Sequence, residues 1–155
     1  RLVERDGRQA PCRTHEIPLG APVDPEALPR VEGVPEDSYR QLSARYGHAA
    51  ERVLETAGSR GELAQPIVPG LPDLLAEAPF SVRHEQSRSV GDVLLRRTRL
   101  GLLAARELCQ PGAGAATRTA RAMAPELGWD GARIADEVQR FLAEADSEGL
   151  VVSDG

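Results

Sequence analysis

The sequence predicts an all-α fold: a small orthogonal bundle of about five to six helices, preceded by an extended proline-rich linker. Aromatic residues make up only 3% of the chain, so the core must consist mainly of Leu, Val, Ile and Ala, which favours closely packed helices. Apolar residues recur at helical spacing in several stretches after residue 35. Prolines instead mark residues 9–35, where they deny the backbone regular hydrogen bonding.

The chain divides into three parts in this prediction. Residues 1–35 combine the end of a preceding domain with the linker, residues 36–148 form a C-terminal helical domain, and residues 149–155 are a tail. The chain begins at Arg1 rather than at a methionine, so we expect a piece of a longer polypeptide. Its 155 residues suffice for one domain with its own core.

The first predicted helix spans residues 36–57. Pro35 suits its start and Gly58 its end. Its apolar residues recur at helical spacing and predict a core-facing side: Leu42, Tyr46, Ala49, Ala50, Val53, Leu54 and Ala57. Residues 59–72 contain three prolines and two glycines, which predicts a loop with apolar anchors, since proline cannot serve inside a β-ladder.

The least generic stretch, residues 82–103, sets arginines between two apolar runs. A helix near residues 79–87 leads into it. Ser89 and Asp92 then fit the start of a second helix. The serine hydroxyl can accept a hydrogen bond from a backbone amide of the first turn that has no partner within the helix, and the acid lies near the positive end of the helix dipole. Three residues fall on one side of this helix: Val90, Val93 and Leu94.

This second helix ends in an arginine cluster. Arg96 and Arg97 occupy its last turn, where cations suit the carbonyl end of a helix. Thr98 fits a break, after which an apolar face is expected to restart at Leu100, Leu102 and Leu103.

The C-terminal part predicts two more helices after a break at residues 110–115. The first spans residues 117–127 and ends at Gly128, a natural left-handed cap. Trp129 is expected to bury its ring. Asp130 should cap the second helix, residues 131–147, whose apolar face consists of Ile134, Val138, Phe141, Leu142 and Ala145.

Charge and cysteine content limit the possible functions. The net charge of −5 argues against nucleic acid as a partner, because such domains are usually basic. All 19 basic residues are arginine, a bias that we attribute to a GC-rich genome. Cys12 and Cys109 stand alone, so neither a zinc site nor a disulfide framework is indicated. With no signal peptide or membrane-spanning run, we expect a reduced, cytoplasmic setting.

The arginine cluster supplies the candidate site residues of the sequence. Guanidinium groups pair in two-point fashion with carboxylates, phosphates or backbone carbonyls. We favour a structural or interdomain role over phosphate or nucleic-acid binding, since charge clusters are usually paired or solvated. The residues concerned are His84, Glu85, Arg96, Arg97 and Thr98.

We predict no catalytic, cofactor-binding or metal-binding residue in the chain. Nucleotide-binding, hydrolase and metal-binding signatures are absent from the sequence. His84 lacks an obvious nucleophile partner, and the pair His15–Glu16 lies in a proline-rich segment where we regard it as incidental.

Several of these segments resemble the C-terminal domain of FAD-dependent (aerobic) glycerol-3-phosphate dehydrogenases and the related alpha-glycerophosphate oxidases. The most specific matches are RRTRL at residues 96–100 and LGWD at residues 127–130. Weaker matches, in the same order as in the family, are RYG at 45–47, EAPFSVRHE at 77–85 and CRT to PLG at 12–20. The resemblance covers roughly residues 10–145.

The resemblance implies a parent enzyme that oxidises sn-glycerol 3-phosphate to dihydroxyacetone phosphate and passes electrons through FAD to a quinone, or to oxygen in the oxidases. In the family, the FAD and substrate residues lie N-terminal to this region, so the N-terminal FAD/substrate domain of the same chain is the expected partner, and the fragment itself is expected to be inactive and to bind no cofactor. A peripheral position of the parent at the inner face of the plasma membrane and homo-oligomers are left open. The alternative is a stand-alone helical domain for protein interaction or regulation.

Overall fold

The computed structural model describes residues 23–109 and 114–150. Several predictions fall outside these ranges. They concern the end of a preceding domain at residues 1–8, the first part of the linker, Cys12, the His15–Glu16 pair and the end of the tail at 151–155.

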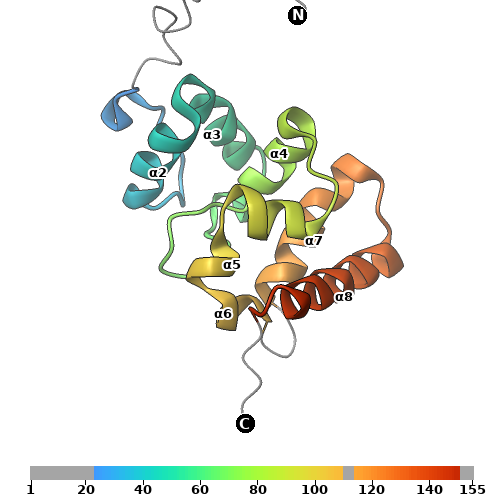
Figure 1. Cartoon of the computed structure of the whole chain (residues 1–155). Coiled ribbons are helices and arrows are strands. Elements are labelled where there is room, and N and C mark those ends of the chain that lie inside the picture. The colour runs from blue at the N-terminus through green and yellow to red at the C-terminus, as the bar shows by residue number, and fades with distance from the viewer. Residues whose placement is uncertain (1–22, 110–113, 151–155) are drawn as a thin grey trace, which may run out of the picture.

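Helices form all the regular structure of the described residues (Figure 1), which confirms the predicted all-α class. They run in several directions rather than side by side along one axis. Seven α-helices lie in the described ranges, against the expected five to six: α2 (Glu36–Tyr46), α3 (Ala50–Ser59), α4 (Glu77–Glu85), α5 (Leu100–Leu103), α6 (Ala105–Cys109), α7 (Gly114–Leu127) and α8 (Gly131–Ser147). Short 3-10 turns and one π-helical segment complete the fold: η2 (Pro25–Ala27), η3 (Gly47–Ala49), η4 (Gly61–Ala64) and η5 (Asp92–Arg97).

The prediction of one continuous helix over residues 36–57 is wrong, because Gly47 divides it into α2 and α3. Gly47 has a φ of +53°, a conformation that glycine adopts without steric cost. Its amide caps α2 by donating to the Ser43 carbonyl. The predicted apolar face is nevertheless correct, since Leu42 and Leu54 are fully buried while Tyr46 is partly buried against the same core.

The described end of the predicted linker lies against α2. Leu28 is only 3% exposed, and the Val31 amide donates to the Tyr39 hydroxyl at 2.8 Å. Ser43 also donates a hydrogen bond to the Val23 carbonyl. Residues before Glu36 therefore contribute to the packing of the domain, and the boundary at residue 35 stays a prediction.

The core joins α3, α4, α7 and α8 to the loop between α3 and α4. The expected apolar anchors of this loop are buried, with Ile67 fully enclosed and Val68 4% exposed. An isolated antiparallel bridge between Pro66 and Leu74 closes the loop. Phe141 of α8 is among the largest side chains enclosed in this core, so the loop and helices form one hydrophobic unit.

The two C-terminal helices follow the prediction closely. α7 starts three residues earlier than expected, and Gly128 after it has a φ of +66°, as predicted for a left-handed cap. Asp130 caps α8, its Oδ1 accepting the Arg133 amide at 2.8 Å. Trp129, expected to be buried, is buried only in part, and the Arg133 guanidinium lies over its ring, 5.7 Å from the centroid. None of the described helices is long and apolar enough to span a bilayer.

Candidate functional site

The arginine stretch begins with the predicted helix start. The Ser89 hydroxyl accepts the Asp92 amide at 3.1 Å, and Asp92 Oδ2 accepts the amides of Arg88 and Ser89 at 2.9 and 3.0 Å. These reciprocal bonds form a capping box. Burial pushes the pKa of Asp92 upward, but the hydrogen bonds outweigh it and lower the pKa of this carboxyl.

The residues after this start form the π-helical segment η5, which the sequence did not predict. Val90, Val93 and Leu94 are fully buried, as expected from their spacing. Thr98 ends the segment: both its amide and its Oγ1 donate to the Val93 carbonyl at 2.9 Å. The break predicted at Thr98 is thereby confirmed, and Arg99 follows it in the left-handed region with a φ of +58°.

The apolar face expected after the break is only partly correct. Leu100 is fully buried, whereas Leu102 and Leu103 are 73% and 70% exposed. The reason is that α5 lasts only four residues, so only one side of a single turn meets the core.

Arg96 and Arg97 each join η5 to another helix. Arg96 pairs with Glu144 of α8 at 2.5 Å and, more loosely, with Asp92 at 3.6 Å. Arg97 donates to the Glu85 carbonyl at the end of α4 at 2.8 Å, and its Nε lies 3.8 Å from a Glu85 carboxylate oxygen. Both side chains are about half exposed. Glu85, Arg96, Arg97 and Thr98 thus come together around η5.

Gly91 makes room for the Arg96 pair. A Cβ built at this glycine would lie 2.1 Å from a Glu144 carboxylate oxygen. The absence of a side chain therefore lets α8 bring its acid to the N-terminal end of η5.

His84 does not join this cluster. Its ring lies against Phe80 with centroids 4.8 Å apart, and Arg52 Nη2 of α3 lies 3.3 Å from its Nε2. His84 is therefore a contact between α4 and α3, apart from the cluster with which the sequence grouped it.

A buried charge network that the sequence did not reveal lies beneath the cluster. Arg45 Nη1 pairs with both Asp73 and Glu77 at 2.6 Å, and the two carboxylates are each 1% exposed. The Tyr46 hydroxyl donates to Glu77 Oε2 at 2.9 Å, and the Leu74 amide donates to Oε1 at 2.8 Å. This network, defined by Arg45, Tyr46, Asp73 and Glu77, ties α2 to α4 and to the loop before α4.

Burial dominates the protonation of this network. It raises the pKa of the Glu77 carboxyl, against the opposing attraction of Arg45. Burial and the nearby Glu77 also raise the pKa of Tyr46, so the phenol keeps its proton and remains a donor. Despite its burial, Arg45 is held in its charged form by Glu77 and Asp73.

One signal in the sequence could have indicated the network. Asp73 and Glu77 are acids within the otherwise apolar run LPDLLAEAPF, and acids in such surroundings are buried only when they are paired. Arg45 could not be identified as their partner from spacing, because it lies 28 and 32 residues away from them.

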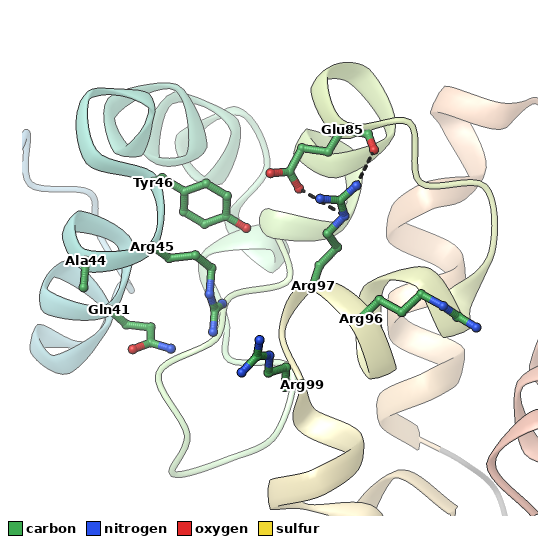
Figure 2. A pocket seen from close by; sticks show the side chains of 8 residues that line it. All are labelled: Gln41, Ala44, Arg45, Tyr46, Glu85, Arg96, Arg97 and Arg99. Carbon is green, nitrogen blue, oxygen red and sulfur yellow. Dashed lines mark hydrogen bonds and ion pairs between the residues drawn. The ribbon is translucent and has the colours of Figure 1, made fainter. Parts of the chain in front are cut away.

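An open pocket of about 460 Å³ lies between α2, α4 and the arginine stretch (Figure 2). Its lining consists of Gln41, Ala44, Arg45, Tyr46, Glu85, Arg96, Arg97 and Arg99. Figure 2 shows Arg97 directed at Glu85, Arg96 directed away from the pocket, and the guanidinium groups of Arg45 and Arg99 directed toward each other. The pocket is therefore lined mainly by cationic and neutral polar groups.

The chain is similar to known proteins over most of its length. Residues 12–134 match the family described as the C-terminal domain of alpha-glycerophosphate oxidase. Glycerol-3-phosphate dehydrogenase 1 of Mycobacterium tuberculosis is 40% identical over 104 residues, 66% of this chain and 19% of the relative. Glycerol-3-phosphate dehydrogenase 2 of the same organism is 31% identical over 125 residues, 81% of this chain and 21% of the relative.

A plant relative shares the same region. The mitochondrial glycerol-3-phosphate dehydrogenase SDP6 of Arabidopsis thaliana is 34% identical over 101 residues, 65% of this chain and 15% of the relative. The chain thus spans about a fifth or less of the length of these relatives. No solved structure matches it significantly.

Proposed function

Because the chain belongs to the family of C-terminal domains of alpha-glycerophosphate oxidase, we propose that it is the helical, non-catalytic part of a larger FAD-dependent glycerol-3-phosphate dehydrogenase. The parent would oxidise sn-glycerol 3-phosphate to dihydroxyacetone phosphate. The observation that carries the proposal is the match of residues 12–134 to a domain that makes up about a fifth of relatives with this name. We also propose that the parent passes electrons through FAD to a quinone. It would then lie at the inner face of the plasma membrane.

The flavin would be held by the region N-terminal to this domain. Dinucleotide sites of the Rossmann type need a strand, a glycine-rich turn and a helix in succession. Within residues 23–109 and 114–150 the regular structure is helical, so these residues do not form a Rossmann-type site for the flavin dinucleotide. We therefore assign no step of the flavin chemistry to them.

We assign the domain a structural and docking role. Its charged side chains are used to join helices: Arg96 reaches α8, Arg97 reaches α4, and Arg45 connects α2 to α4. Leu102 and Leu103 are the large hydrophobic side chains exposed on the described surface, and exposed apolar groups beside arginines are typical of protein interfaces. They support docking of this face on the catalytic part.

Two observations on the isolated chain and its gene test the proposal. The purified 155-residue chain should show no flavin absorbance between the near-ultraviolet and the blue, and it should not turn over glycerol 3-phosphate. The reading frame upstream of Arg1 should encode a strand followed by a glycine-rich dinucleotide fingerprint. A yellow protein, or a start codon close to Arg1, would contradict it, and the latter would favour a stand-alone interaction domain.

Replacing Arg97 by Ala in the longer enzyme tests the role of the arginine stretch. The variant should dock more weakly or melt at a slightly lower temperature, because the bonds of Arg97 to Glu85 of α4 are lost, while the bound flavin keeps its spectrum. Arg121→Ala, an exposed arginine of α7, is the matched control. Normal melting of the Arg97 variant with abolished substrate binding would instead place this stretch at the active site.

A further inference from the structure

Arg99 is the one guanidinium lining the pocket that has no ion pair or hydrogen bond to another described residue. Arg96, Arg97 and Arg45 each have a protein partner. Arg99 is exposed, and its side chain is directed toward Arg45 across the pocket (Figure 2). A structural role explains the other three arginines but leaves this orientation unexplained.

The backbone of Arg99 adds a second observation. Its φ of +58° places it in the left-handed region, which costs a non-glycine residue about 1 kcal/mol or more. Glycine would occupy this corner without that cost. Gln86 has the same conformation at the end of α4, where it is an ordinary helix end; at Arg99 the corner also places a charged side chain in the lining of the pocket.

The charges around the pocket favour an anion. Arg97 is already bonded to Glu85 and Arg45 to the buried Asp73 and Glu77, which leaves Arg99 as the guanidinium of the lining without a described carboxylate partner. The acids that balance Arg45 are 1% exposed and do not line the pocket. Arg45 Nη2 has only a long contact of 3.5 Å to the Thr98 carbonyl, so this donor remains available on the pocket side.

We propose that this pocket binds a phosphate group, with Arg99 as the main ligand and Nη2 of Arg45 as the second donor. A phosphate dianion suits two facing guanidinium groups better than a single carboxylate does, because it offers more charge and more acceptor oxygens. The volume of about 460 Å³ admits a small phosphate monoester. The site is argued from the geometry of this chain, and binding of inorganic phosphate tests it separately from the function proposed above.

Titration calorimetry on the 155-residue chain at low ionic strength tests the site, with inorganic phosphate as the first probe and glycerol 3-phosphate as the second. One saturable site with a Kd of about 1 mM or tighter is expected for both probes, with weaker binding as salt is added. Glycerol, which lacks the charged group, should not bind. Arg99→Gln should weaken phosphate binding at least about tenfold.

Arg121→Gln is the matched control, because Arg121 is an exposed arginine of α7 outside the pocket lining, and it should bind phosphate like the unaltered chain. Circular dichroism should show that both variants are folded, since both positions are exposed. The site is disproved if the binding of inorganic phosphate does not saturate, or if Arg99→Gln and Arg121→Gln lose affinity for phosphate equally. Binding of anionic phospholipid vesicles without binding of inorganic phosphate would also overturn it.

Discussion

The buried network around Arg45 and the exposed cluster around Arg97 use the same residue types in opposite surroundings. Arg45 meets two carboxylates that are each 1% exposed. Arg97 is 45% exposed, and its Nε lies 3.8 Å from the Glu85 carboxylate, which is 24% exposed. Removing a partner from a buried pair typically costs several kcal/mol, whereas an exposed pair contributes little. The number of arginines in a stretch therefore does not tell which arginine stabilises the domain.

The largest predicted effect is that of Arg45→Ala. The substitution leaves Asp73 and Glu77 buried without their cation, which should lower the free energy of unfolding by about 3–5 kcal/mol. Urea denaturation of the isolated chain measures the change. Arg40→Ala, whose side chain is 72% exposed and paired with Asp37, should cost less than about 1 kcal/mol. Similar losses of unfolding free energy in Arg45→Ala and Arg40→Ala would contradict the distinction between buried and exposed arginines.

A smaller effect is expected for Asp92→Asn, which weakens the capping box at the edge of the exposed cluster. The loss at neutral pH should be about 1 kcal/mol. Because the pKa of Asp92 is lowered in the folded chain, its contribution is present above the unfolded value of about 3.9 and is lost as the pH falls through the folded value. The difference in free energy of unfolding between Asp92→Asn and the unaltered chain should therefore become smaller as the pH is lowered. A difference that stays constant with pH would contradict this.

The smallest effect, and one of opposite sign, is expected for Arg99→Gly. Relief of the left-handed backbone should raise the free energy of unfolding by up to about 1 kcal/mol, partly offset by the added freedom of glycine in the unfolded chain. Gln86→Gly is the control, since Gln86 also has a positive φ, +60°, and caps α4. Both variants should be stabilised, but only Arg99→Gly should lose phosphate binding. A destabilised Arg99→Gly variant would show that the side chain supports the fold.

Local patterns predicted most of the fold. The capping box at Ser89, the break at Thr98 and the cap at Asp130 each depend on residues within five positions of one another, so sequence spacing is enough to identify them. The division at Gly47 was missed because the apolar period continues through the glycine, and only tertiary packing distinguishes a bent helix pair from one helix.

The site was less accessible to sequence reasoning. Arg96 and Arg97 were identified by their density along the chain, but their partners Glu144 and Glu85 come from other helices. The Arg45 network joins residues about 30 positions apart, and no local spacing reports such a contact. The left-handed backbone of Arg99 is a conformation that arginine rarely adopts, so nothing in the sequence indicated it.

Double-mutant cycles on the isolated chain test the central contrast most directly. One cycle combines Arg45→Met with Glu77→Gln, and the other combines Arg97→Met with Glu85→Gln. We expect a coupling energy of about 2 kcal/mol or more for the buried pair and less than about 1 kcal/mol for the exposed pair. Equal coupling energies, or a larger one for Arg97 and Glu85, would contradict the conclusion that the interior network holds the domain together.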